Sequence, residues 1–577
     1  MTESVPARSM GIVRSVPGDP NAFDIIVVGA GAGGMAAACT AAALGQRVLL
    51  LEHSQRVGGT TAISGGMVWI PANHKMAAAG LEDSLDRARD YLRATVPGAD
   101  EDRRMQAFLA RGDEAVRFLE QHTSLKLQPV RRYPDYYPER AGATPGGRVL
   151  EPVPYDGREL GADFALLRDP LPEFLLFGGM MISREDLPVL RRVTQSPAAV
   201  WHTAKLLARY LLQRLSAHRG TSLYLGNALA ARLLKSLREL KVDLQTGQRV
   251  HRLLVEGDRV AGVVLGETGH EQVLRARRGV ILATGGISRH PALRQAYVPE
   301  SAGTLTATVD TGAASGGAHL AQAAGAQLSP TTRTLAFWVP ASVGRRTDGS
   351  TAIFPHTVTD RAKPGLIAVN RDGQRFTNEA VSYHEFVQAQ LRDTARNVPA
   401  WLICDRRFLW KYGLGRIRPF ALSVQHEISS GYLQRAETLA ALASRIGVPA
   451  AAFEATVQAF NADAQRGVDS AFGRGGDIYQ RHLGDGAHQP NPCVAPLLDA
   501  PFYAVSVFPA DLGMAAGVVT DAHARALRGD GTPINGLYAC GNDMHSVMNG
   551  AYPGPGITLG PALVFGYLAA SHASSAA

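Results

Sequence analysis

This sequence of 577 residues has few cysteines, no long apolar run and no metal-binding motif. The four cysteines are widely separated and form no C-x-x-C pair. This argues against a disulfide framework or a zinc site and favours a reducing, cytoplasmic compartment. No stretch of about 18 or more apolar residues occurs, so no membrane-spanning helix is expected. The histidines include no H-E-x-x-H, so no metal site is expected either.

An excess of charge of one sign is also missing. The formal net charge is only +8, so composition gives no reason to expect nucleic acid as a partner. Hydrophobic residues make up 46% of the chain and charged residues 19%, which excludes wholesale disorder and allows a large buried core. Residues 1–21 carry Pro, Ser and Arg but no apolar signal-peptide core, and we expect a flexible N-terminal arm there.

The first motif that is present is Gly29-x-Gly31-x-x-Gly34, directly after an apolar strand predicted at residues 23–28. A small-residue helix and a second strand that ends at Glu52 follow, which completes a βαβ unit. Gly29 permits a tight turn, Gly31 lets the backbone approach a pyrophosphate, and Gly34 lets the helix pack on the strand. The helix N-terminus then binds the pyrophosphate, and Glu52 binds ribose hydroxyls. The sequence therefore predicts a dinucleotide site.

Three further glycine turns favour FAD over NAD. Gly58–Gly66 is a second loop rich in glycine and hydroxyl groups, Ala283–Gly286 follows another predicted strand, and Gly536–Asp543 forms a turn near the C-terminus. Several separated backbone loops suit a cofactor that is larger than NAD. Because the middle of the chain carries no such turn, we expect a discontinuous nucleotide domain with another domain inserted.

Together, Gly29–Gly34, Glu52 and the three turns resemble the FAD-dependent fumarate reductase/succinate dehydrogenase flavoprotein superfamily, over most of residues 22–577. Some relatives attach FAD covalently through a His in the second loop; Gly59 stands at that position here, so FAD is expected to be non-covalent. The residues expected to contact FAD are Gly29, Gly31, Gly33, Gly34, Glu52, Gly59, Thr60, Thr61, Ser64, Gly65, Gly66, Ala283, Thr284, Gly285, Gly541, Asn542, Asp543, Gly556, Thr558 and Leu559.

The expected fold is α/β. A Rossmann-like FAD-binding domain, discontinuous in sequence, covers about residues 22–340 and 512–577, and an inserted α+β catalytic domain covers about 341–511. Within the insertion, residues 435–466 carry the clearest helical pattern. The substrate is expected to lie between the two domains.

Two segments indicate the branch of the superfamily. In fumarate reductases an Arg four residues after a Glu donates the proton, whereas here Tyr383 stands four residues after Glu379. The segment Gly541–Leu563 resembles the signature of the 3-ketosteroid Δ1-dehydrogenases, and the aromatic loop Asp135–Glu139 resembles a loop of the same family. The 3-ketosteroid Δ4-dehydrogenases and fumarate-type reductases are alternatives with the same fold. A non-catalytic flavin- or sterol-binding protein is the alternative outside enzymes.

The resemblance implies FAD-dependent 1,2-dehydrogenation of a 3-ketosteroid, from a 3-oxo-4-ene to a 1,4-dien-3-one. Removal of the C2 proton requires a base and stabilisation of negative charge on the C3 oxygen. The family implies Tyr383 as the base and Tyr136 as its hydrogen-bond partner, with Tyr137 as the alternative partner. Tyr552 and the backbone N–H of Gly556 would bind the C3 oxygen, and the C1 hydride would pass to flavin N5.

An insertion at about 160–220 is basic and is predicted to contain an amphipathic helix. From Leu187 to Arg238 the chain carries nine Lys or Arg and no acid, and a helix is predicted at residues 200–215 with its apolar residues on one side. That side either packs on the core or lies on an anionic bilayer. Membrane contact would place the protein peripherally on the inner membrane and would suit a sterol such as cholest-4-en-3-one, besides androst-4-ene-3,17-dione.

The expected partners are thus a 3-ketosteroid substrate and an electron acceptor, either a quinone or a soluble carrier. The sequence leaves the oligomeric state, the acceptor and the preferred steroid side chain open.

Overall fold

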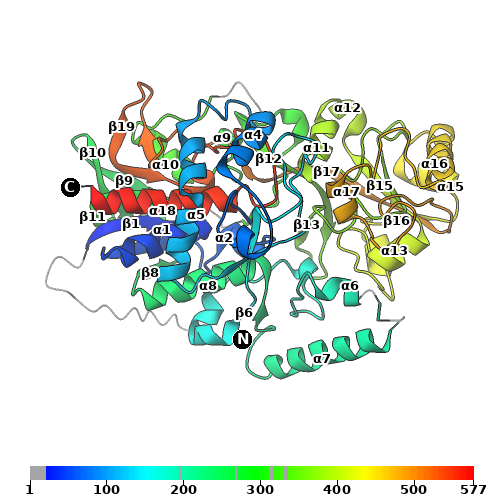
Figure 1. Cartoon of the computed structure of the whole chain (residues 1–577), viewed down its shortest axis with the longest axis horizontal. Coiled ribbons are helices and arrows are strands. Elements are labelled where there is room, and N and C mark those ends of the chain that lie inside the picture. Colours follow the sequence, from blue (N-terminus) through cyan, green and yellow to red (C-terminus); the bar gives the residue numbers. More distant parts are fainter. Residues whose placement is uncertain are drawn as a thin grey trace.

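The computed structural model describes residues 21–190, 192–193, 196–266, 269–310, 316–330 and 335–576. Two large sheets form the two halves of the described chain along its longest axis, with helices around them (Figure 1). The flexible arm predicted at residues 1–21 lies, apart from Asn21, outside the described residues.

An eight-stranded sheet forms the first half. Its strands are β1 (Ala22–Val28), β2 (Val48–Glu52), β8 (Asp243–Thr246), β9 (Val250–Glu256), β10 (Arg259–Leu265), β11 (Gln272–Leu282), β18 (Arg525–Leu527) and β19 (Pro533–Ala539). Their order is β18-β19-β10-β11-β1-β2-β8, with β9 beside β10 and a second pairing of β19 with β11. The row β19-β11-β1-β2-β8 is parallel throughout. The apolar middle of β1 is fully buried, as expected for a parallel strand that is covered on both faces.

The two ends of the chain meet in this half. Helix α1 (Ala32–Ala43), which follows β1, packs on α18 (Leu559–Ser575) from the C-terminus and on α8 (Leu225–Glu239). The helices approach closely because small residues face each other: a Cβ added to Gly566 would lie 2.5 Å from the carbonyl oxygen of Gly33. Strand β19 and helix α18 therefore complete the nucleotide fold that β1 begins, and the predicted discontinuous Rossmann-like domain is confirmed.

A six-stranded antiparallel sheet forms the second half. Its strands are β12 (Ala336–Arg345), β13 (Thr351–Pro355), β14 (Leu366–Val369), β15 (Ala400–Cys404), β16 (Gln434–Ala436) and β17 (Phe502–Met514), in the order β13-β12-β17-β15-β14 with β16 beside β17. The helices of this half are α11 (Tyr383–Leu391), α12 (Thr394–Asn397), α13 (Arg406–Tyr412), α14 (Gln425–Ser429), α15 (Leu439–Ile446), α16 (Ala450–Ala464) and α17 (Ile478–Leu483). The boundaries expected near residues 340 and 511 fall inside β12 and β17, which pair with each other.

Shorter elements lie between the two sheets and along the first. They are β3 (Val68–Trp69), β4 (Leu127–Pro129), β5 (Val149–Pro152), β6 (Tyr155–Asp156), β7 (Ser222–Leu223), α2 (Gly59–Ile63), α3 (Lys75–Ala78), α4 (Leu85–Thr95), α5 (Arg103–His122), α9 (Pro291–Gln295), α10 (Gly317–Ala323) and 3-10 turns at Gly157–Leu166, Pro172–Phe174, Glu300–Ala302 and Gly541–Asp543. Strands β3, β5 and β4 form a small sheet, and the loop between β4 and β5 carries the aromatic segment at 133–137.

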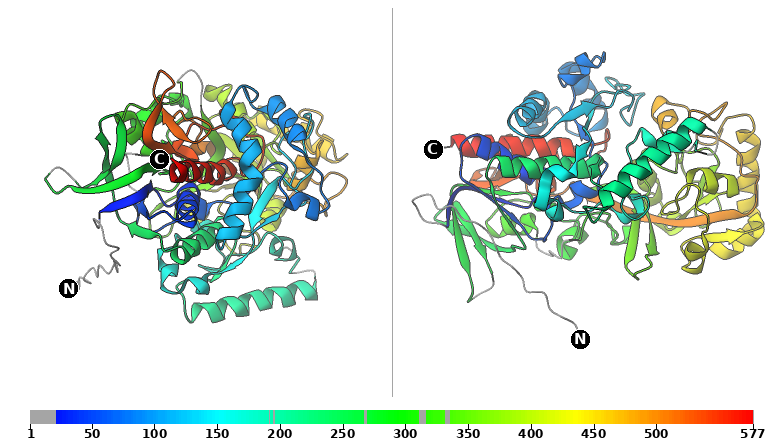
Figure 2. Two further views of the ribbon diagram at one scale, coloured as in Figure 1. Left: turned by 60° about the vertical axis from the view of Figure 1, so that its left-hand side comes forward. Right: turned by 90° about the horizontal axis from the view of Figure 1, so that it is seen from below.

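The basic insertion carries α6 (Asp186–Leu190) and α7 (Pro197–Arg214). Helix α7 lies at the margin of the molecule, apart from both sheets, in Figure 1 and in the left view of Figure 2, and it faces the viewer in the view from below (Figure 2, right). A small cluster of Met180, Leu206 and Tyr210 holds it to the preceding loop. That loop contacts the second half through an ion pair of 2.7 Å between Glu173 and Arg346.

Candidate active site

The glycines of the first turn divide into two groups. A Cβ on Gly29 would lie 2.3 Å from the carbonyl oxygen of Ala283, and a Cβ on Gly34 would lie 1.9 Å from the carbonyl oxygen of Gly29. Glycine is therefore needed at these two positions, where backbone segments pack closely. By contrast, the nearest atom to a Cβ on Gly31 is the hydroxyl oxygen of Thr61, 3.9 Å away, and Gly33 faces α18. Gly31 thus leaves free space at the start of α1, where the helix has no side-chain cap.

Glu52 lies at the carboxyl end of β2 beside this turn. Its carboxylate accepts hydrogen bonds from the backbone N–H groups of Ala30 and Ser54, both at 2.8 Å. These bonds fix the carboxylate next to the glycine turn, where the sequence predicts contact with a ribose.

The second loop forms the short helix α2. The hydroxyl of Thr61 accepts from the N–H of Ala32, and that of Thr60 accepts from the N–H of Val309, both at 3.1 Å. The Ser64 hydroxyl accepts from the N–H of Gly66 at 3.1 Å and so holds the loop. A Cβ on Gly65 would meet no atom within 4 Å, and one on Gly59 would meet only the Cα of Gly31 at 3.8 Å. The two loops therefore leave space between them.

Asp543 joins the third turn to the C-terminal turn. Its fully buried carboxylate accepts from the N–H and the hydroxyl of Thr284, the latter at 2.9 Å, and from the N–H of Gly286 at 2.9 Å. Burial raises the pKa of Asp543, which these hydrogen bonds oppose. The side chain predicted to touch FAD thus fixes two backbone loops, while Gly285, beside it, leaves open space within 4 Å of a Cβ.

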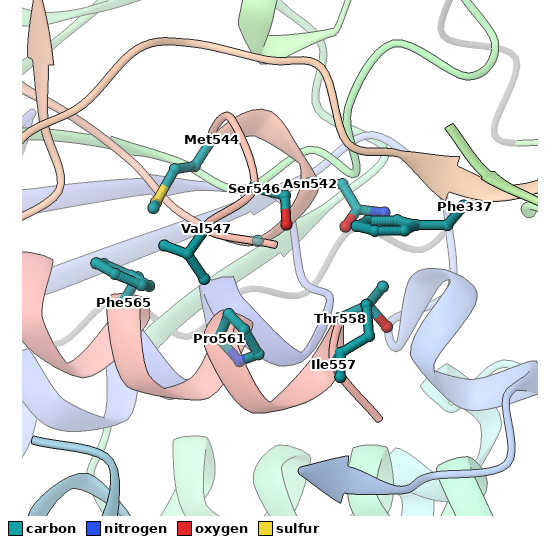
Figure 3. A pocket seen from close by; sticks show the side chains of 10 residues that line it. Phe337, Asn542, Met544, Ser546, Val547, Ile557, Thr558, Pro561 and Phe565 are labelled. Carbon is teal, nitrogen blue, oxygen red and sulfur yellow. The ribbon is translucent and has the colours of Figure 1, made fainter. Parts of the chain in front are cut away.

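A pocket opens between the C-terminal turn, strand β12 and the first turn of α18 (Figure 3). The side chains of Phe337, Asn542 and Thr558 line it together with Ile557, and the backbone of Gly541 completes this side. Leu559, also predicted to contact FAD, is the first residue of α18. Glycine backbones that leave space, an uncapped helix start and polar groups at strand ends together fit a long dinucleotide. Of the residues predicted for FAD, Gly541, Asn542 and Thr558 line this pocket, and Ala283 lies beside Gly29.

A cluster of buried tyrosines lies where the two halves meet. The hydroxyl of Tyr136 donates a 3.0 Å hydrogen bond to that of Tyr383. The ring of Tyr552 lies 5.1 Å from that of Tyr383 and 5.6 Å from that of Tyr136, between centroids. Tyr383 is the first residue of α11 and follows the N-cap Ser382, so a negative phenolate would lie near a positive helix end.

Burial governs the ionisation of the three phenols. It raises the pKa of Tyr383 and Tyr136 well above the ordinary tyrosine value and that of Tyr552 to about 12. The hydrogen bond from Tyr136 acts in the opposite direction on Tyr383, because it stabilises the phenolate. The phenols are therefore neutral near pH 7 and need a route for their protons.

The structure separates Tyr136 from its neighbour Tyr137. The hydroxyl of Tyr137 donates to a carboxylate oxygen of Glu385 at 2.7 Å, away from Tyr383. Gly556, the fourth residue expected at the reaction centre, has a φ of +94°, and a Cβ there would lie 2.5 Å from the carbonyl oxygen of Met67. Glycine is therefore required just before α18.

Sequence reasoning missed several residues of the cluster. The ring of Tyr479 lies 4.8 Å from that of Tyr136, the ring of Phe337 lies 5.5 Å from that of Tyr552, and buried His384 lies 5.7 Å from Tyr552. Tyr133 was detectable as part of the same aromatic run as Tyr136. Tyr479 carries no motif, and only the packing of α17 brings it here.

Comparison with known proteins adds the family context. Residues 24–559 match the family model described as "FAD binding domain". The chain is 38% identical over 565 residues to a 3-oxosteroid 1-dehydrogenase of Mycobacterium tuberculosis, which covers 95% of this chain and 98% of the relative. It is also 38% identical over 552 residues to a 4-oxocyclohex-2-ene-1-carboxylate 5-dehydrogenase of Sinomonas cyclohexanicum, with 95% and 93% covered.

A solved structure is similar as well. The 3-ketosteroid Δ1-dehydrogenase of Sterolibacterium denitrificans, in complex with 1,4-androstadiene-3,17-dione, superposes with a TM-score of 0.88 at 38% sequence identity. The match covers 96% of this chain and 100% of that one.

Proposed function

Because the chain belongs to the family of FAD-dependent oxidoreductases that contains the 3-oxosteroid 1-dehydrogenases, we propose that it converts 3-oxo-4-ene steroids into 1,4-dien-3-ones. The observation that carries the proposal is the 3.0 Å hydrogen bond between Tyr136 and Tyr383, beside Tyr552. This pair offers a base with a second group to take its proton, which the removal of a C2 proton requires.

We assign each of these residues one role in the proposed reaction. Tyr383 accepts the proton from C2. The two hydroxyls then rotate and reverse their hydrogen bond, so that Tyr136 takes up the proton of Tyr383. The hydroxyl of Tyr552 and the N–H of Gly556 bind the C3 oxygen, where negative charge grows as the C2–H bond breaks. Bound FAD, held without a covalent bond, supplies the acceptor for the hydride from C1. The electron pair of the C2–H bond becomes the second bond between C1 and C2.

Reduction of a dicarboxylate is disfavoured by the same residues. Such a substrate requires cationic side chains that are free to bind carboxylates. Tyr383 is uncharged, and the guanidinium of Arg361, which is buried near the tyrosines, donates to the backbone carbonyls of His356, Thr357, Glu379 and Val381.

A cyclic 4-oxo carboxylate is the second candidate substrate, favoured by the similarity to the Sinomonas cyclohexanicum enzyme. It shares the ketone and the adjacent C–H bonds with a 3-ketosteroid. The steroid is preferred because apolar and aromatic side chains dominate the surroundings of the tyrosine cluster, and these suit an uncharged ring system.

Anaerobic mixing of the FAD-loaded protein with single substrates tests the proposal. With androst-4-ene-3,17-dione we expect loss of the oxidised-flavin absorbance and formation of a 1,4-dien-3-one, and we expect the same with cholest-4-en-3-one. Bleaching only with 4-oxocyclohex-2-ene-1-carboxylate would select the second candidate. No bleaching with any of the three, combined with reoxidation of reduced flavin by fumarate, would move the protein to the reductase branch. Formation of a 4-ene from a saturated 3-ketosteroid without a 1,4-diene would select Δ4-dehydrogenation.

We also propose that α7 contacts an anionic bilayer, from which a poorly soluble steroid would enter. Leu206 and Tyr210 of this helix are buried. Other apolar side chains of the helix and of its C-cap stay exposed: the exposed fraction is 64% for Trp201, 64% for Leu211, 68% for Leu212 and 84% for Leu215. Lys205 lies 5.2 Å above the ring of Trp201, and the helix contains no acidic residue. Exposed apolar side chains beside cations match an anionic membrane surface. No helix among the described residues is both long and apolar enough to cross a bilayer.

Sedimentation with phosphatidylglycerol-containing vesicles tests this contact. The intact protein should bind these vesicles and bind neutral phosphatidylcholine vesicles less. The variant Trp201→Ser/Leu211→Ser/Leu212→Ser should stay in the supernatant, whereas Leu498→Ser, at an exposed apolar position in the other half, should behave as the parent protein. Equal sedimentation of the triple variant and the parent would refute the contact.

The electron acceptor is proposed to be a quinone or a soluble carrier. Reoxidation of the substrate-reduced protein by a water-soluble quinone, followed by flavin absorbance under anaerobic conditions, tests the quinone. Reoxidation only by a soluble dye would favour the soluble carrier.

A further inference from the structure

Two buried tyrosine hydroxyls in the cluster have no assigned task. Tyr133 and Tyr479 are 2% and 1% exposed, and neither hydroxyl makes a hydrogen bond of standard geometry among the described residues, although that of Tyr133 is close enough to Tyr136 for the Tyr136 hydroxyl to lower the pKa of Tyr133. Both phenols lie close enough to the other tyrosines to interact electrostatically with them: Tyr133 with Tyr136, Tyr383 and Tyr552, and Tyr479 with Tyr136. Buried hydroxyls without partners are costly, so their presence beside a reacting pair calls for an explanation.

Helix α17 connects this cluster to the surface. It places Tyr479 against Tyr136, with ring centroids 4.8 Å apart, and one turn later it places His482 against Tyr133, with centroids 4.6 Å apart. Tyr136 and Tyr133 are likewise three residues apart. His482 is exposed, whereas the tyrosines that it covers are buried. The order Tyr383, Tyr136, Tyr133, His482 therefore leads from the centre of the site to solvent.

The proposed reaction needs such a route, because each turnover leaves one proton on buried phenols. We propose that Tyr133 and His482 carry this proton from the Tyr383–Tyr136 pair to water. As Tyr383 binds the C2 proton, the hydroxyls of Tyr383 and Tyr136 rotate so that Tyr383 becomes the donor, and its own hydroxyl proton moves to Tyr136. The proton of Tyr136 moves to Tyr133, and that of Tyr133 reaches a ring nitrogen of His482 through a bridging water. Each oxygen gains one proton and gives one up, because a hydroxyl can both donate and accept. His482 then releases its proton to water.

The charges around His482 favour release of the proton from its imidazole to water. The pKa of His482 is lowered to about 4, first by partial burial of the side chain and then by the positive charges of Arg184 and Lys363. The guanidinium of Arg184 also lies 5.5 Å above the ring of Tyr133. The imidazole is therefore neutral when the proton arrives, and the nearby cations drive the proton onward.

Chemical rescue of the FAD-loaded enzyme tests this route, which rests on the proposed function. In His482→Ala we expect kcat with androst-4-ene-3,17-dione to fall by about tenfold or more with an unchanged KM, and added imidazole should restore it. In Tyr133→Phe we expect kcat to fall similarly. Added imidazole should not restore kcat in this variant, because the missing hydroxyl is buried and imidazole replaces only the exposed side chain of residue 482. A merely structural loss would not respond to imidazole in either variant.

Matched controls keep the outcomes distinct. His426→Ala removes another exposed histidine of the same half, and Tyr155→Phe removes the hydroxyl of another buried tyrosine; both should keep the parent kcat. A parent enzyme that forms no 1,4-dien-3-one would refute the proposed function itself. A fully active parent with His482→Ala within twofold of His426→Ala, or with a loss that imidazole does not restore, would refute the proton route alone.

Discussion

The hydroxyl of Tyr136 donates a 3.0 Å hydrogen bond to the hydroxyl of Tyr383, although 247 positions of the chain separate the two residues. Tyr136 comes from the loop between β4 and β5 in the nucleotide-binding half, and Tyr383 begins α11 in the inserted half. The bond therefore forms only when both halves are folded and in contact. It joins the proposed base to the group that takes its proton.

Removal of this bond should slow proton transfer without emptying the flavin site. In Tyr136→Phe we expect kcat to fall by about 10²-fold, the lower end of the usual contribution of acid–base groups, with FAD content unchanged. Steady-state rates and the flavin absorbance per protein measure the two effects. Tyr137→Phe is the matched control, because its hydroxyl is bonded to Glu385 instead. Equal losses in both variants would contradict the assignment of Tyr136.

Substitution of Gly556 should disturb the site by strain. Gly556→Ala forces a side chain into a backbone conformation with a φ of +94° and places its Cβ 2.5 Å from the carbonyl oxygen of Met67. The strain is on the order of 1–3 kcal/mol and would shift the N–H that is proposed to bind the C3 oxygen. We expect a lower melting temperature and a loss of kcat, measured by calorimetry and initial rates. Gly486→Ala, where a Cβ meets no atom within 4 Å, should change neither. Parent-like rates in Gly556→Ala would exclude a role for this backbone.

Asp543 should control FAD retention through the loops that it fixes. In Asp543→Asn one carboxylate oxygen becomes an NH₂ group that faces a backbone N–H donor, that of Thr284 at one oxygen position or that of Gly286 at the other, at a cost of about 1–3 kcal/mol. We expect faster FAD release, seen as a rise in free-flavin fluorescence, and lower thermal stability. Asp530→Asn is a suitable control, since exposed Asp530 accepts similar bonds from Thr532. Tight FAD binding in Asp543→Asn would show that the loops hold without the carboxylate.

The rate should rise with pH into the alkaline range. Burial raises the pKa of Tyr383 and Tyr136 above the ordinary value near 10, so the phenolate fraction increases about tenfold per pH unit below that pKa. We expect log(kcat/KM) to increase up to the pH at which the protein unfolds. The raised pKa also makes folding stability depend on pH. The stabilising effect of a neutral, buried Tyr552 is complete below about pH 10 and is lost as the pH rises toward 12. A kcat/KM that falls between pH 7 and 9 would contradict a tyrosine base.

Much of the nucleotide-binding half could be predicted, because local spacing determines it. Gly29 and Gly34 must be glycine for steric reasons that act within one βαβ unit, and Glu52 follows from the length of that unit. Tyr383 and Tyr552 were predictable because each lies in a motif that resembles a known family. The helical pattern at 435–466 was only partly right: it begins with β16 and then divides into α15 and α16, because Gly447 ends α15 in a left-handed conformation and Pro449 precedes α16.

Contacts that depend on tertiary packing could not be predicted. Tyr479 and His482 meet Tyr136 and Tyr133 only because α17 lies on the aromatic loop, and no sequence pattern links the two segments. Similarly, a helical wheel identifies the apolar side of α7 but not the direction in which it points. The structure leaves Leu211 and Leu215 exposed, whereas Leu206 and Tyr210 form the buried contact.

Exchange of the C2 hydrogens of androst-4-ene-3,17-dione with D₂O tests the central claim most directly. With FAD kept reduced under anaerobic conditions, hydride removal is blocked and only proton transfer at C2 can occur. Mass spectrometry should detect deuterium at C2 with the parent enzyme and at least about 10²-fold slower incorporation with Tyr383→Phe. Equal incorporation by the two proteins would show that Tyr383 is not the base that removes the C2 proton.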